Sequence, residues 1–280
     1  MLLNSRIVPD TGYAGKFSRS VRRIREGTRV LPCAASLAAI LTMAMLLMAC
    51  SNQVSVPEVQ RIIDRSIEVH GGDRYLRSEI TFTFRDIHYL ARRENGLYSY
   101  ERRFTDERGT IHDVYNNSGF NRTISGEPEP LDEEYTGRYR RSVNSVIYFA
   151  LLPYALNDPA VRKNYLGREI IGNSDYHKIE VTFEQEGGGR DFEDVFVYWI
   201  HPETYTMDYM AYEYFTDGGG IRFRQALNPR EIGGIRFADY NNYRPVSETD
   251  TVYDMGAAFE EGRLELVSII SLENIRVEGL

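Results

Sequence analysis

Cys50 carries the clearest chemical signal in this sequence of 280 residues. It follows an arginine-rich start and an apolar run over residues 31–48, and the small residue Ala49 stands directly before it. A positive start, an apolar middle and a small-residue exit are typical of an export signal. Leu47 and Ala49 fit the lipobox of bacterial lipoproteins, although Met48 is bulkier than the usual alanine or serine. The motif predicts cleavage before Cys50 and a lipid on its thiol.

An uncleaved membrane anchor is the alternative, because the apolar run approaches the ~20 residues that a span needs. An anchor has no need of Ala-Cys at its exit, so we favour the cleaved signal. The first twenty residues do not resemble a signal start, which leaves open a true start near Val21. The predicted organisation is a lipoprotein signal peptide over 1–49, a lipidated tether over 50–55 and one domain over 56–280.

Processing changes both the charge and the thiol content. Residues 1–49 contain two acids and seven bases, so 41 acids and 33 bases fall to 39 and 26, a net charge of −13. Such an acidic chain is a poor candidate for binding nucleic acid. Cys33 leaves with the signal, so no disulfide, thiolate metal site or cysteine nucleophile is expected. Ser51, in place of an aspartate after the cysteine, favours the outer membrane over the inner one.

The remaining residues give no catalytic motif. A Schiff-base aldolase would need Lys163 or Lys178 at the top of a (β/α)₈ barrel, and the chain lacks eight βα units. No G-x-S-x-G elbow occurs, and the glycine runs 187–189 and 218–220 precede strand-like sequence, which favours turns over phosphate loops. The five histidines show no compact ligand spacing, although a metal site assembled from separate strands stays open. We predict no catalytic residue, no metal and no cofactor.

Aromatic content is the positive signal, with 20 tyrosines in the chain. Neighbouring residues such as Tyr198 and Trp199 point to opposite faces of a strand, so both faces need cover or one face lines a cavity. One interpretation is a core with surface tyrosines. The other is a cavity for a hydrophobic ligand, with these candidate lining residues: Phe82, Phe84, Tyr98, Tyr100, Ile147, Leu151, Tyr198, Trp199, Tyr209 and Phe223.

The elements that would position these residues follow from periodicity. Ser55 and Glu58 have capping-box spacing before a helix that ends at residues 70–72. Period-two patterns predict strands over 80–85, 98–104 and 111–115. A second helix is expected from a Ser142 cap to Pro153, and a short third helix from Asp158 to residue 167.

Strands dominate from residue 169 onward. Alternation and glycine turns predict strands over 177–183, 195–200, 207–215, 221–226, 235–243 and 264–277. Short turns make neighbouring strands antiparallel. The expected fold is therefore α+β: a curved antiparallel sheet of about ten strands, an open half-barrel, with two or three helices covering its concave face.

Several segments resemble a known group. The helix ending in His70-Gly71-Gly72 and the strand–turn–strand at 198–205 resemble exported proteins with the lipoprotein-carrier (LolA/LolB-like) fold. Residues 148–243 resemble an uncharacterised lipoprotein family of Gram-negative bacteria, through Leu151-Leu152-Pro153-Tyr154, Tyr198-Trp199 and Gly234-Ile235-Arg236-Phe237. Members of that family are sometimes labelled deoxyribose-phosphate aldolase. The resemblance implies an open half-barrel with an acyl-chain cavity and no established functional residue.

These observations predict a lipid-anchored envelope protein that binds a lipid, an acyl chain or a lipoprotein. We expect it in the outer membrane, attached through the lipid on Cys50 and facing the periplasm, with no nucleic-acid partner. The alternatives are an enzyme of the aldolase type and a structural lipoprotein without a small ligand. The oligomeric state stays open.

Overall fold

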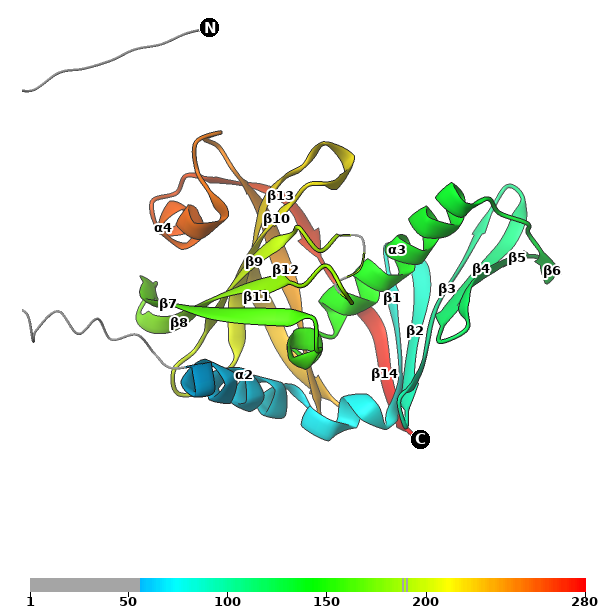
Figure 1. Ribbon diagram of the computed structural model, residues 1–280, viewed down its shortest axis with the longest axis horizontal. Helices are drawn as coiled ribbons and strands as arrows, with labels where there is room; N and C mark the ends of the chain where they lie inside the picture. The colour runs from blue at the N-terminus through cyan, green and yellow to red at the C-terminus, as the bar shows by residue number, and fades with distance from the viewer. Residues whose placement is uncertain (1–55, 188, 190) are drawn as a thin grey trace, which may run out of the picture. The chain divides into compact units, whose positions relative to one another are not determined.

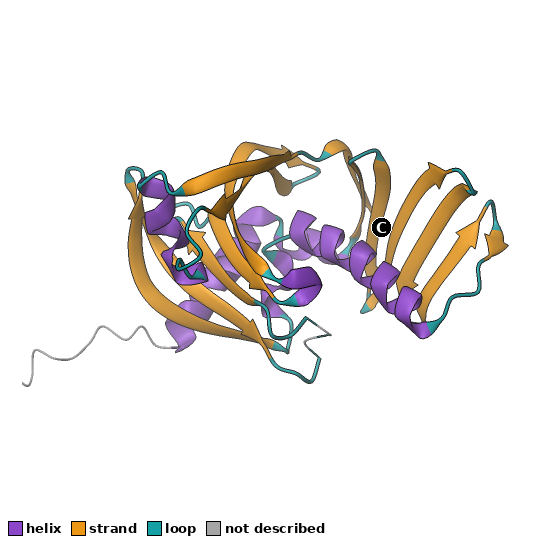
Figure 2. Cartoon of the chain, turned by 90° about the horizontal axis from the view of Figure 1, so that it is seen from above, coloured by secondary structure: helices purple, strands orange, loops and turns teal. Residues whose placement is uncertain are grey.

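The computed structural model describes residues 56–187, 189 and 191–280. The predicted signal peptide, the tether with Cys50 and the Ser55 cap lie outside these residues. Fourteen described strands form two antiparallel sheets of seven strands each, with three α-helices (Figures 1 and 2). The predicted α+β class with antiparallel pairing is confirmed, and the strands number fourteen in two sheets where about ten in one sheet were expected.

The first sheet has the order β14-β1-β2-β3-β4-β5-β6 and consists mainly of hairpins between consecutive strands. Its strands are β1 (Ser78–Phe84), β2 (Ile87–Glu94), β3 (Leu97–Asp106), β4 (Gly109–Asn116), β5 (Gly119–Ile124), β6 (Glu127–Pro128) and β14 (Glu273–Gly279). The tight turns lie at residues with positive φ, such as Asn95 and Gly96 between β2 and β3.

The second sheet has the order β13-β12-β11-β10-β9-β8-β7. Here, unlike in the first sheet, every pair of neighbouring strands is consecutive along the chain. Its strands are β7 (Val161–Ile171), β8 (Ser174–Phe183), β9 (Val195–Ile200), β10 (Met207–Tyr214), β11 (Gly220–Ile232), β12 (Ile235–Pro245) and β13 (Leu264–Ile270). β9 matches the predicted strand 195–200 at both ends. The predicted third helix over 158–167 is wrong, because most of that segment belongs to β7, which pairs with β8.

The helices cover both faces of the second sheet. α2 (Val56–His70) packs Val59, Ile62 and Ile63 into the core on the face that carries Tyr198. α4 (Met255–Glu260) packs Met255 and Ala258 on the opposite face, against Trp199 and Phe223. This cover on both faces explains why β9 is apolar throughout, because both sets of its side chains are buried.

α3 (Glu133–Ala150) follows the last hairpin strand of the first sheet and leads to the second sheet (Figures 1 and 2). Its N-cap is Asp132, whose side chain accepts a hydrogen bond from the Tyr135 amide at 2.8 Å. The predicted cap at Ser142 is therefore wrong, and the helix begins about three turns earlier. The polar residues 133–141 show no clear apolar stripe, so periodicity detected only the half of the helix that contributes Val143 and Ile147 to the core.

A polar cluster divides the predicted strand 264–277 into β13 and β14. Arg230 donates to Asp239 at 2.9 Å and to the Leu272 carbonyl at 2.7 Å, and the Leu272 amide donates to Asp239 at 3.1 Å. Because these bonds occupy the backbone of Leu272, the ladder with β12 ends there. The chain then continues into the other sheet, where β14 pairs with β1.

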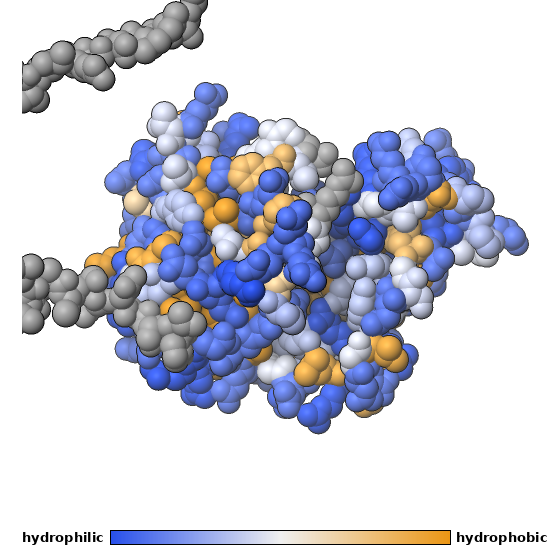
Figure 3. Space-filling view, viewed as in Figure 1, coloured by the Kyte–Doolittle hydropathy of each residue, from blue (hydrophilic) through white to orange (hydrophobic). Residues whose placement is uncertain are grey.

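The face shown in Figure 3 is mainly hydrophilic, with separate apolar patches. Beneath it lie three clusters of buried apolar side chains, one under α2, one between α3 and the first sheet, and one under α4. None of the helices that the described residues form combines the length and the apolar character required to cross a bilayer.

Candidate ligand-binding cavities

Two cavities flank the second half of α3. Asn144, Ile147, Tyr148 and Leu151 face the larger one, which has a volume of about 530 Å³. The neighbouring helix positions Ser145, Val146, Phe149 and Ala150 face a smaller one of about 280 Å³. The two linings share no residue, so the helix separates two distinct hollows. Their volumes lie near the range of about 300–1,000 Å³ that is usual for small-molecule sites.

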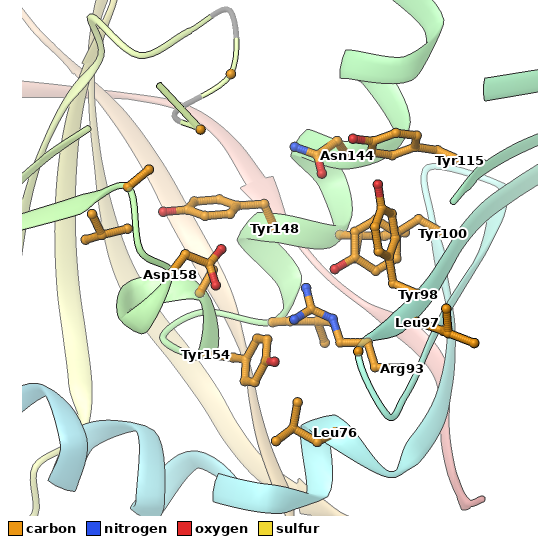
Figure 4. A pocket seen from close by; sticks show the side chains of 18 of the residues that line it. Leu76, Arg93, Leu97, Tyr98, Tyr100, Tyr115, Asn144, Tyr148, Tyr154 and Asp158 are labelled. Carbon is orange, nitrogen blue, oxygen red and sulfur yellow. The ribbon is translucent and has the colours of Figure 1, made fainter. Parts of the chain in front are cut away.

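The larger cavity is lined mainly by aromatic and aliphatic side chains. Tyr98 and Tyr100 on β3 and Tyr115 on β4 form one wall, with ring centroids 5.1 Å apart for the first pair and 5.3 Å apart for Tyr98 and Tyr115 (Figure 4). α3 forms the facing wall with Ile147 and Tyr148. The strands thus hold flat rings against an apolar helix face, an arrangement suited to a hydrocarbon or a planar ligand.

Arg93 is the main polar feature of this cavity. Its guanidinium lies over the Tyr154 ring at 4.2 Å and over the Tyr100 ring at 5.2 Å (Figure 4). Burial lowers the pKa of Arg93, and its Nε has no protein hydrogen-bond partner among the described residues. Desolvation raises the pKa of the Asp158 carboxyl, also in the lining, while the charge of Arg93 acts in the opposite direction. The cavity therefore contains both signs of charge.

The smaller cavity contains cations without acids. Arg85 and Arg224 belong to its lining, and no aspartate or glutamate does. Arg224 on β11 is 8% exposed and lies over the Phe149 ring at 4.1 Å. Its Nη2 donates to the Tyr212 hydroxyl at 3.0 Å, whereas its Nε lacks a protein partner in the described part of the chain.

The ten predicted lining residues divide among several places. Tyr98, Tyr100, Ile147 and Leu151 line the larger cavity together. Phe84 lines the smaller one, and Phe82 is buried in the core between α3 and the first sheet. The other four belong to the second sheet: Tyr198 lies in the core under α2, and Trp199, Tyr209 and Phe223 lie in the core under α4.

Sequence reasoning missed the polar residues of both cavities. Arg93 lies on β2, a strand that was not predicted, and Arg224 lies on a predicted strand but stood among many arginines. Tyr148 and Tyr154 flank the predicted Leu151 in the chain. Tyr148 stands three residues before Leu151 on α3, and this helical spacing could have identified it. Tyr154 lies beyond the end of α3, so helical spacing does not point to it.

Neither lysine of the domain lines either cavity. Lys163 lies on β7, and its Nζ donates to the Gln60 side chain at 3.1 Å. The Nζ of Lys178 is 2.8 Å from Glu169 Oε2 and donates to the Tyr253 carbonyl at 2.7 Å. A Schiff-base lysine needs a free amine facing its substrate, so these contacts give the aldolase alternative no support.

The histidines are dispersed. His70 is buried at the end of α2, and burial lowers its pKa to about 4. His112 Nε2 lies 2.8 Å from Glu101 Oε2, and His177 Nδ1 lies 3.1 Å from the Tyr165 hydroxyl. Among the residues that the structure describes, no three histidine, cysteine, aspartate or glutamate side chains are arranged to hold a metal ion.

Comparison with known proteins gives a family and a set of similar folds. The model of DUF6503, described as a family of unknown function, matches residues 38–273. No curated protein matches the chain. Similar solved structures include a LolA superfamily protein from Nitrosomonas europaea, with 11% identity, 79% of this chain and 94% of that chain covered, and a TM-score of 0.45.

A DUF1329 family protein from Desulfovibrio piger is also similar, with 11% identity, 79% and 93% coverage and a TM-score of 0.42. An outer membrane lipoprotein-sorting protein domain from Vibrio parahaemolyticus has 10% identity, 79% and 93% coverage and a TM-score of 0.37.

Proposed function

This chain belongs to DUF6503, a family of unknown function, and we propose that it is a lipid-anchored envelope protein that binds a hydrophobic ligand in its larger cavity. The supporting observation is the hollow of about 530 Å³ bounded by α3, the first sheet and the paired ends of β7 and β8, and lined by tyrosines and aliphatic side chains. Burying an acyl chain against such a lining gains about 0.8 kcal/mol per CH₂ group. Four of the lining residues predicted from the sequence meet in this cavity: Tyr98, Tyr100, Ile147 and Leu151.

A cavity-filling variant tests the ligand site. Asn144 is exposed on α3 and lines the larger cavity, so Asn144→Trp fills the hollow without removing a core side chain. We expect a fluorescent fatty-acid probe to bind the full chain in nanodiscs, after subtraction of empty nanodiscs, and Asn144→Trp to abolish that binding. Arg138→Trp, at an exposed position of the same helix outside both linings, is the matched control. Equal binding by both variants would contradict the proposal.

The proposed anchor is the lipid on Cys50, with the protein attached to the outer membrane and facing the periplasm. The support is the sequence motif, since the anchor lies outside the described residues. Labelling cells with a radioactive fatty acid should mark the protein, and Cys50→Ala should remove both the label and the membrane association. Fractionation of the two bacterial membranes on a density gradient tests the location. Recovery of the label in Cys50→Ala would show that the anchor is elsewhere.

A further inference from the structure

The smaller cavity beside α3 has the composition of an anion site. We propose that it binds an acidic amphiphile, with a carboxylate or phosphate group held by Arg224 and a short apolar chain packed beside it. This site is separate from the larger cavity, with which it shares no lining residue. The proposal therefore does not depend on the function assigned to that cavity.

The lining of the smaller cavity supplies no counter-charge for Arg224. Arg224 is 8% exposed, and no carboxylate of the described residues forms an ion pair with it. A guanidinium charge in so little-exposed a place is costly without a partner. The stacking on Phe149 and the bond to the Tyr212 hydroxyl compensate only in part, and Nε is left without a protein partner.

Other polar side chains lie beside Arg224 on the same face of the second sheet. Cross-strand pairing places Tyr198, Met210, Arg224 and Asn242 in one row across β9 to β12. Burial raises the pKa of Tyr198 well above its usual value and also raises that of Tyr240, which lines the cavity. Both groups are therefore neutral hydroxyls able to donate a hydrogen bond. Tyr198 lies beside Tyr148 and does not itself line the smaller cavity, so Tyr240 is the hydroxyl placed to donate there.

The rest of the lining of the smaller cavity includes an apolar wall. It consists of side chains from both sheets, α3 and the segment after β13: Phe84, Val146, Ala150, Ile270 and Leu272. A free inorganic anion would leave this wall unused, whereas a short hydrocarbon chain would cover it. At about 280 Å³ the hollow suits a head group with a few carbons, and not a whole diacyl lipid. The arrangement thus favours an amphiphile over a simple ion.

Calorimetric titration of the full chain in nanodiscs, with empty nanodiscs as the blank, tests the proposal. Octanoate and octyl phosphate carry the two head groups on the same chain, octanol removes the charge, and inorganic phosphate removes the chain. We expect at least one of the two amphiphilic anions to bind roughly tenfold to a hundredfold more tightly than octanol, the range for hydrogen bonds to a charged group. The stronger of the two identifies the head group.

Three substitutions locate the effect. Arg224→Met should reduce the affinity for the anion to that for octanol, and Ser145→Trp should remove binding of both by filling the smaller cavity. Arg244→Met, at an exposed arginine paired with Glu265 outside the lining, should keep the preference. If Arg224→Met fails to fold, Arg224→Lys keeps the charge but loses the planar fork, and should lower the preference several-fold.

Three results would overturn the proposal: no preference for the anions over octanol, a preference that survives Arg224→Met, or inorganic phosphate binding as tightly as octyl phosphate. These results leave the larger cavity unaffected, because Asn144→Trp reports on that cavity and Ser145→Trp on this one.

Discussion

Both sheets bury arginine side chains against α3, but only the first sheet supplies a carboxylate for them. Asp113 on β4 is fully buried and accepts from Arg122 through both oxygens at 2.6 and 2.8 Å, and from Arg102 Nε at 2.6 Å. Arg102 also donates to Ser142 on α3 at 2.6 Å. Arg224 in the second sheet has an aromatic face and one hydroxyl in place of these partners.

The presence or absence of a carboxylate separates a structural network in the first sheet from a charge in the second sheet that a ligand can reach. In the first sheet Arg102 and Arg122 share the Asp113 carboxylate, and the bond from Arg102 to Ser142 attaches this network to the middle of α3. In the second sheet a cation and several neutral donors meet at a cavity without an acid. The same residue type therefore stabilises the fold in one region and is available to a ligand in the other.

Removing the shared carboxylate should have the largest effect. Asp113→Asn leaves Arg102 and Arg122 buried without a negative charge, so we expect the free energy of unfolding to fall by about 3–5 kcal/mol. Urea denaturation measures it. Asp175→Asn is the control, since Asp175 pairs with Arg168 at the surface and such pairs contribute about 0–1 kcal/mol. A loss for Asp113→Asn no larger than that of the control would mean that the network is not closed by Asp113.

His70 is a buried base that can lose its proton, so its contribution to the free energy of unfolding should depend on pH, unlike that of the buried arginines. Burial lowers the pKa of His70 to about 4, and the nearby positive charge of Arg236 acts in the same direction. The unfolded chain then binds more protons than the folded one between pH 6.5 and pH 4, so stability falls as the pH falls. Between pH 7 and pH 5 we expect this histidine to contribute a loss of about 2 kcal/mol.

Urea denaturation at several pH values measures this dependence. His70→Gln should flatten it relative to the wild type, and His88→Gln, at an exposed histidine, should not. Parallel pH profiles for the wild type and His70→Gln would show that His70 is not buried as a neutral base.

The Tyr139 ring, which covers Arg122 in the Asp113 network, should contribute less to the free energy of unfolding than Asp113 does. The Tyr139 ring lies 3.4 Å from the Arg122 guanidinium carbon. Tyr139→Leu keeps apolar volume but removes this contact, and we expect a loss of about 1 kcal/mol in the free energy of unfolding. Tyr135→Leu, one turn earlier on the exposed part of α3, should change it by no more than about 0.5 kcal/mol. Thermal melts of the two variants compare their stabilities. A larger loss of stability in Tyr135→Leu than in Tyr139→Leu would contradict a role for the Tyr139 ring.

Removing the unpaired cation should have the smallest effect on stability. Arg224→Met replaces a buried charge without a carboxylate by an apolar side chain of similar length. We expect the free energy of unfolding to stay within about 1 kcal/mol of the wild type, on the stabilising side. Denaturation without ligand measures it, with Arg122→Met as the destabilised counterpart because that variant disrupts the Asp113 network. A loss in Arg224→Met equal to that in Arg122→Met would show that the fold itself uses the Arg224 charge.

Elements with local signals can be predicted from the amino-acid sequence alone. The helix ending at His70, the strand 195–200 and the antiparallel pairing follow from periodicity and turn residues, which act between neighbours in the chain. The family-like segments and the lipobox at Cys50 are also local patterns. The aromatic positions Tyr98 and Tyr100 were identified as lining candidates because strand alternation places both on one face.

Contacts between residues far apart in the chain set the point where the chain changes sheets and select which charges are paired. The break at Leu272 depends on Arg230 and Asp239, which lie far from it in the sequence. The early start of α3 depends on packing against the first sheet, because polar helix residues have no hydrophobic period to reveal them. Arg102, Arg122 and Arg224 are the same residue type. Whether each of them pairs with a carboxylate depends on strand register, which is fixed by contacts between residues distant in the sequence.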